Sequence, residues 1–182
     1  MAKKIAHGLE LSKQSWSALM QNRQLVLFPL ISGIGMVVVT ILFFIPEAFA
    51  FRLIAETEES TSVQSIVVVA IVFLYYLVAS FVVIFSNTAL VGATLKIIDG
   101  QPATVGDGIA IARSRLRKVF VYSLISATVG MVARSITAIG RESDNILVAI
   151  VTAIIGGMLQ GAWSILVFFA IPVMIVEDVG VR

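Results

Sequence analysis

Four long apolar segments alternate with polar stretches along the chain. The first holds 21 uncharged residues, and the second and fourth are longer still. A helix of 21 residues spans about 32 Å, close to a hydrocarbon core about 30 Å thick. The third apolar segment contains a single charge, Arg134. The pattern therefore predicts four membrane-spanning helices, at about residues 25–45, 63–95, 119–139 and 146–176.

Composition supports this fold class, an all-α integral membrane protein with one helical domain over residues 1–182. Hydrophobic residues make up 59% of the chain and charged residues 13%, and the mean hydropathy is +1.03. Soluble domains are usually about 25% charged. The absence of cysteine excludes disulfides and thiolate chemistry. The one histidine, His7, has no second ligand or base nearby, so we expect no catalytic residue, no metal and no cofactor.

Two polar stretches flank the first predicted span. In residues 1–24, apolar side chains recur at helical spacing among lysines, which favours an amphipathic helix in the membrane interface over a disordered basic tail. The stretch after the first span carries Glu56, Glu58 and Glu59. A solvated loop explains this cluster better than a calcium site, because the ligand spacing and the glycine of a calcium loop are missing.

Residues 86–120 form the central polar segment, which we call the elbow. Small residues at its start favour close helix packing. Thr104 and Asp107 match a capping box, and a basic amphipathic helix is expected over 104–118. We predict that its basic residues bind lipid headgroups or dock a partner; they are Arg113, Arg115, Arg117 and Lys118. Membrane spans on both sides make lipid a simpler partner than nucleic acid, and we expect no nucleic acid to bind.

Polar residues and glycines inside the predicted spans are the other candidates. Asn87 and Gln160 are expected to form contacts between helices rather than to touch a ligand, and Gly157 and Gly161 form a G-x-x-x-G packing pattern. Arg134 either extends toward the interface or faces inward. An inward Arg134 would meet an anionic substrate or pair with a carboxylate, of which the candidates are Glu47, Glu142 and Asp144.

The distribution of basic residues predicts the orientation. Ten of the thirteen Lys and Arg residues lie in the N-terminal region, the elbow or the C-terminal end, and three lie in the remaining loops or spans. By the positive-inside rule, both termini and the elbow are cytoplasmic. We expect a multi-pass protein of a prokaryotic inner (plasma) membrane, because no organelle-targeting pattern is visible.

Several motifs together resemble an uncharacterised family of prokaryotic polytopic membrane proteins, a domain of unknown function. They cover nearly the whole chain, as Ser15-Trp16, Leu25 to Gly33, Phe85 to Gly100, Pro102 to Met131 and Gly161 to Asp178. The resemblance implies a helical, membrane-embedded fold and no particular activity. It also implies that such chains often continue past the acidic Val176-Glu177-Asp178, so this one is either a partial example or one that takes further helices from a partner.

Three functional hypotheses follow from these features. The chain has more faces of small residues than the packing of four helices requires. This excess favours a non-catalytic accessory subunit or assembly factor, bound to membrane lipids and to other subunits or copies of itself. Arg134, Gln160 and the hydroxyl-bearing third span favour a small transporter or channel as the alternative. An enzyme is disfavoured, because no paired carboxylates or nucleophile–base pair lies in a span.

Overall fold

A computed structural model describes residues 23–55 and 62–176. These residues form five helices and no strand: α2 (Arg23–Ala55), α3 (Ser62–Ile98), α4 (Val105–Ser114), α5 (Leu116–Arg141) and α6 (Ile146–Val176). The acidic cluster of Glu56, Glu58 and Glu59 lies outside the described residues. So does the predicted interfacial helix 1–24, apart from residues 23 and 24. The all-helical fold class is confirmed.

Four of these helices are long and apolar enough to cross a membrane, as predicted, so the protein is a multi-pass membrane protein. α6 matches its predicted bounds. α2 differs, because it continues past Ile45 through Pro46 and Glu47 to Ala55. The first charge marks where a span leaves lipid, but a helix keeps its internal hydrogen bonds in water and need not end there. α2 instead stays helical beside α3.

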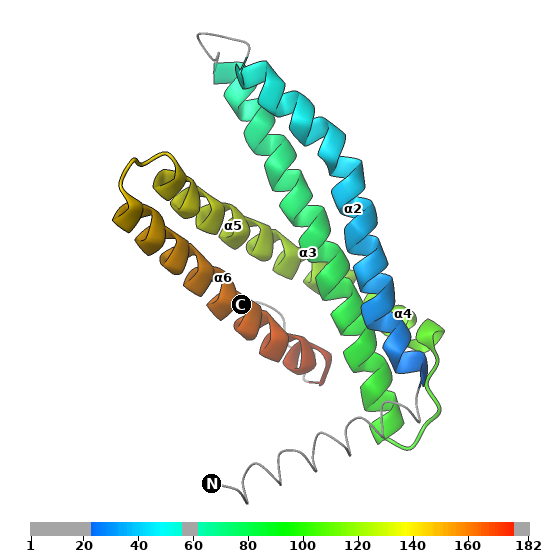
Figure 1. Cartoon of the computed structure of the whole chain (residues 1–182). Coiled ribbons are helices and arrows are strands. Elements are labelled where there is room, and N and C mark those ends of the chain that lie inside the picture. Colours follow the sequence, from blue (N-terminus) through cyan, green and yellow to red (C-terminus); the bar gives the residue numbers. More distant parts are fainter. Residues whose placement is uncertain (1–22, 56–61, 177–182) are drawn as a thin grey trace, which may run out of the picture.

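The helices form two antiparallel hairpins joined through α3. α3 packs against each of the other four described helices, whereas α2 packs against α3 and α4 but against neither α5 nor α6. Figure 1 shows the two hairpins diverging toward their loops. We call the side where α2 and α5 end the hairpin side, and the side that carries α4 the elbow side. The four spans thus form an open array rather than a closed bundle.

Buried clusters join the helices at several levels. On the elbow side, Phe28 of α2 packs with Ala89 and Ala93 of α3 and with Ala112 of α4. A second cluster joins α3, α5 and α6, and a third joins α2 and α3. In the small-residue stretch at the start of the elbow, Thr88, Ala89, Gly92 and Ala93 are buried. This stretch therefore packs against helices, as its composition predicted.

The predicted helix 104–118 is divided in two. α4 ends at Ser114, Arg115 has non-helical angles (φ −115°, ψ 18°), and α5 begins at Leu116. Arg117 and Lys118 therefore belong to the first turn of α5. The break coincides with a contact distant in sequence, because Arg115 donates from Nη1 to the Met174 carbonyl at 2.9 Å and from Nη2 to the Ile175 carbonyl at 3.0 Å. Helical periodicity carries no signal for such a contact.

Candidate functional site

A cleft opens between the two hairpins within the membrane-spanning segments. Its cavity has a volume of about 370 Å³ and takes lining residues from all four spans. α3 and α6 supply most of the wall, and α2 contributes Met36. The residues that line this inner cleft are Met36, Tyr75, Tyr76, Ala79, Ser80, Val83, Ile84, Asn87, Ser126, Gln160, Trp163, Ser164, Val167 and Phe168.

Hydrogen-bonding groups interrupt the apolar wall of the inner cleft. Trp163 Nε1 donates to Ser126 Oγ at 2.8 Å, which ties α6 to α5. Among the residues that the structure describes, the side-chain amides of Asn87 and Gln160 have no hydrogen-bond partner. In lipid an unpaired amide is costly, because hydrocarbon offers no donors or acceptors. Neither amide therefore makes the predicted contact between helices within residues 23–55 and 62–176.

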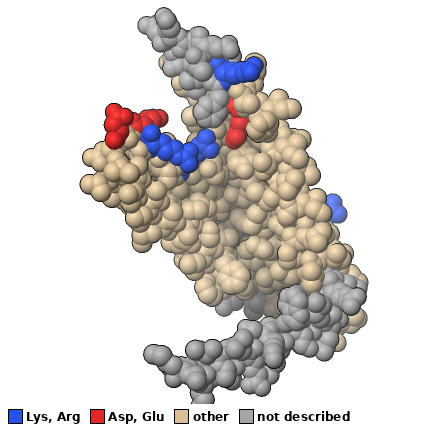
Figure 2. All heavy atoms as spheres, in the orientation of Figure 1, with Lys and Arg blue, Asp and Glu red and all other residues tan. Residues whose placement is uncertain are grey.

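A second hollow, which we call the outer groove, lies between α5 and α6 toward the hairpin side. Its volume is about 690 Å³, and it shares Tyr76 and Gln160 with the inner cleft. Its charged lining residues are Arg134, Arg141 and Glu142. Figure 2 shows charged side chains gathered at the hairpin-side end, while the surface below them on this face is almost entirely uncharged. Through these two shared residues the two hollows adjoin one another along the opening between the hairpins.

The arginine in the third span, Arg134, is exposed and lines the outer groove. Within residues 23–55 and 62–176, no ion pair joins it to Glu47, Glu142 or Asp144. Glu47 is half-buried on α2, and one of its carboxylate oxygens is inaccessible without a hydrogen bond. The alternative in which Arg134 pairs with one of these three carboxylates is therefore not realised, and its cationic group lines the groove.

The glycines of the spans fall into two groups. A Cβ on Gly35, Gly130 or Gly156 would lie within 3.0 Å of a side chain on a neighbouring helix. A Cβ on Gly33, Gly157 or Gly161 would meet no such atom within 4 Å, so these three glycines make no close contact with another described helix. Gly157 also lines the outer groove. Gly156, which the pattern did not single out, is the glycine that packs α6 against α5.

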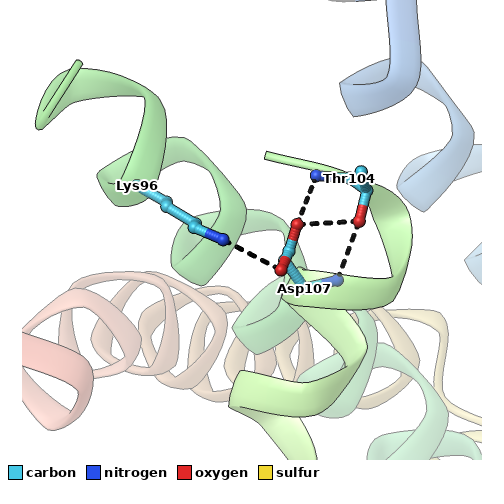
Figure 3. A network of polar contacts seen from close by, with 3 residues as sticks. All are labelled: Lys96, Thr104 and Asp107. Atoms are coloured by element: carbon cyan, nitrogen blue, oxygen red, sulfur yellow. Dashed lines mark hydrogen bonds and ion pairs between the residues drawn. The ribbon is translucent and has the colours of Figure 1, made fainter. Parts of the chain in front are cut away.

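The elbow holds a compact polar network (Figure 3). Thr104 N donates to Asp107 Oδ2 at 2.8 Å and Asp107 N donates to Thr104 Oγ1 at 3.2 Å, which is the predicted capping box. Lys96 Nζ on α3 also contacts Asp107 Oδ1 at 2.9 Å. The hydrogen bond from Lys96 and those from Thr104 hold the pKa of Asp107 well below its usual range. This network ties the start of α4 to the end of α3.

The basic residues of the elbow do not form one surface. Arg113 and Arg117 are exposed, Lys118 is half-buried, and Arg115 is engaged with the end of α6. The apolar face of α4 packs against α3 and Phe28 rather than lying open to lipid. Lipid-headgroup binding by Arg113, Arg117 and Lys118 stays a prediction, whereas the contact that is present at Arg115 is an internal one.

Sequence reasoning missed much of the lining of both hollows. Tyr76 and Ser80 were not among the candidate residues, yet both line the inner cleft. Their polar hydroxyls in an apolar run were the available signal. No group of three or more His, Cys, Asp or Glu side chains that could hold a metal ion occurs among the described residues 23–55 and 62–176.

Comparison with known proteins gives one match. Residues 63–181 match a family described as a family of unknown function, DUF6159. The matched region begins in α3 and so includes the elbow, both arginines of the outer groove and the whole of α6. No curated protein and no solved structure is detectably similar to the chain.

Proposed function

The chain belongs to the DUF6159 family of unknown function, and from this premise we propose that it is a non-catalytic subunit or assembly factor of a larger membrane complex. In this proposal a transmembrane helix of a partner protein lies across the inner cleft. The observation that carries it is the open array, in which α2 leaves α5 and α6 uncontacted and polar groups face the opening.

The unpaired amides are the first support. Asn87 on α3 and Gln160 on α6 line the opening from opposite hairpins. Polar side chains across a helix contact in membranes contribute about 0.6–2 kcal/mol each. Lipid tails cannot make these bonds, whereas a helix that carries a hydroxyl or an amide can. A volume of about 370 Å³ fits side chains projecting from a helix that lies over the opening.

The uncontacted glycines are the second support. On α6, Gly157 and Gly161 lie on the same helical row as Ala153 and Ser164, which line the outer groove and the inner cleft. Gly33 lies one turn from Met36, the residue that α2 contributes to the cleft. Small residues let two helices approach closely, which is the main source of attraction between helices in lipid. Both edges of the opening therefore suit a close helix contact.

The orientation and location belong to the same proposal. With ten basic residues on the elbow side or in the terminal regions, the elbow side faces the cytoplasm of a prokaryotic inner membrane, with both termini there. The exposed Arg113 and Arg117 then lie at the cytoplasmic surface, where they bind anionic headgroups or a partner's cytoplasmic segment.

A matched pair of variants on α6 tests the proposal. The full chain is purified from its own membrane in mild detergent and its partners are identified by native mass spectrometry. Gly157→Leu fills the edge of the opening and is expected to remove a stoichiometric partner. Ala162→Leu adds similar bulk on the opposite, exposed face of α6 and should retain it. A wild-type chain that is a clean monomer, or a partner indifferent to Gly157→Leu, would contradict the proposal.

A small transporter or channel is the second candidate function. The shared lining residues Tyr76 and Gln160 favour it, because two adjoining hollows that carry some hydrogen-bonding side chains give a solute a route along the spans. Flux through vesicles reconstituted with the purified chain tests this candidate. Flux that is unchanged by Arg134→Ala and by Gln160→Ala would count against it.

A further inference from the structure

The outer groove owes its shape to small residues on both of its walls. On α5 these include Gly130, Ala133 and Ala138, and on α6 Ala149 and Ala153. At its floor α5 and α6 touch, since a Cβ on Gly156 would lie 2.6 Å from the Thr137 methyl group. Most of the lining surface is apolar, and the walls belong to membrane-spanning helices. The groove therefore suits a ligand that has an apolar part.

Two arginines on one face of α5 line this groove. Arg134 and Arg141 are seven residues apart on α5, which is close to two helical turns and about 10 Å along the axis. Both line the groove, and neither has an ion pair or a side-chain hydrogen bond within the described ranges 23–55 and 62–176. Arg134 lies inside the third span, where a charge is costly unless an anion or water accompanies it, and Arg141 lies at the end of α5. The described part of the chain therefore supplies no anionic partner for Arg134 or Arg141.

The chemistry of the lining indicates which anion fits. Arginine binds phosphate through parallel N–H donors, and Tyr76, Thr137 and Gln160 place further hydrogen-bonding groups in the same lining. A free phosphate ion would leave the apolar part of the groove uncovered. A phospholipid covers both parts, with its phosphate at the arginines and its acyl chains against the small apolar side chains of α5 and α6.

We propose that the outer groove binds the phosphate of an anionic membrane phospholipid, held by Arg134 and Arg141. This inference does not rest on the proposed partner helix, which occupies the inner cleft. Glu142 also lines the groove and is the one acidic residue among its described lining residues. The carboxylate of Glu142 repels an anionic ligand and so lowers the affinity of the groove. The two arginines outweigh it, and the groove therefore prefers an anionic lipid.

Lipid titration followed by native mass spectrometry tests the proposal on the full chain in detergent. The probes are phosphatidylglycerol and phosphatidylcholine with identical acyl chains. Wild type is expected to prefer phosphatidylglycerol. Each of Arg134→Gln and Arg141→Gln should weaken phosphatidylglycerol binding by about fivefold, the equivalent of about 1 kcal/mol per basic residue. The double variant should lose the preference.

Three controls make the result specific. Arg52→Gln removes an exposed arginine at the end of α2 that does not line the groove, and it should leave binding unchanged. Glu142→Gln should tighten phosphatidylglycerol binding severalfold by removing a like charge. Inorganic phosphate at millimolar concentration should not displace the bound lipid, because it cannot cover the apolar wall.

The outcomes that overturn the proposal are equally defined. A wild-type chain that binds both lipids alike, or an Arg52→Gln variant that loses as much affinity as Arg134→Gln, would show that the arginines of the groove do not select the lipid. Displacement by inorganic phosphate would show a small-anion site in place of a lipid site. Loss of a partner protein in these variants, with lipid preference intact, would bear on the proposed function alone.

Discussion

Two glycines of α4 provide the sharpest test of the packing at the elbow. A Cβ built on Gly108 would lie 2.5 Å from the Ala89 carbonyl oxygen and 2.5 Å from the Phe28 ring. A Cβ on Gly106, half a turn earlier, would have its nearest neighbour at 3.6 Å, which is an ordinary contact. Replacing each glycine by alanine therefore applies the same chemical change in a closed site and in an open one.

The two substitutions are expected to change the free energy of unfolding in opposite directions. Alanine is favoured over glycine within a helix by about 0.5–1 kcal/mol, a gain available to both variants. At Gly108 the added methyl group overpacks a site whose nearest atom is backbone, at a cost of about 1–3 kcal/mol. Gly108→Ala should thus lower the free energy of unfolding by up to about 2 kcal/mol, whereas Gly106→Ala should raise it by up to about 1 kcal/mol.

Unfolding of the full chain in mixed micelles, followed by circular dichroism, measures both variants. Both variants gain the same helix propensity. The difference between their free energies of unfolding therefore measures the cost of overpacking α4 against Ala89 and Phe28. Equal stabilities, or a Gly108→Ala variant more stable than wild type, would refute the close packing of α4 on α3 and with it the internal position of the elbow's apolar face.

Three further predictions concern single interactions. Arg115→Gln removes two charge-assisted bonds worth about 3 kcal/mol together, so hydrogen exchange in the last turn of α6 should accelerate about a hundredfold, and Arg113→Gln should leave it unchanged. The lowered pKa of Asp107 stabilises the elbow above the carboxyl's unfolded-state pKa, and this contribution is lost as the pH falls through the lowered value; Asp107→Asn should remove that pH dependence of unfolding. A double-mutant cycle with Trp163→Phe and Ser126→Ala should give a coupling of about 0.5–1.5 kcal/mol, and additive effects would contradict the bond.

The spans were predictable because lipid enforces a local rule, that an apolar run long enough to cross must be helical. α6 follows this rule at both ends, and the capping box at Thr104 is equally local. The break at Arg115 depends on carbonyls 59 and 60 residues away, which no local pattern encodes. Which glycine of the Gly156-Gly157 pair packs inward depends on the rotation of α6 about its axis, and a motif of small residues does not specify that rotation.

The lining of the inner cleft was only partly predictable for a related reason. Asn87 and Gln160 stood out as polar residues in apolar runs, and both line it. Both were expected to form contacts between helices, and neither forms such a contact among the described residues. Whether these amides meet a neighbouring helix depends on the separation of the two hairpins. α3 contacts both hairpins, but α2 contacts neither α5 nor α6, so the hairpins stay apart. Such a global arrangement has no counterpart in the periodicity of a single segment.

The contacts of Arg115 also have a consequence for biosynthesis. The carbonyls that accept its two hydrogen bonds belong to Met174 and Ile175, so they leave the ribosome about 3–12 s after Arg115 at 5–20 residues per second. During that interval the guanidinium is one of the charges that retain the elbow in the cytoplasm in the proposed orientation. In that orientation Arg115 would act twice, first as a charge that orients the nascent chain and then as the donor that fixes the end of α6.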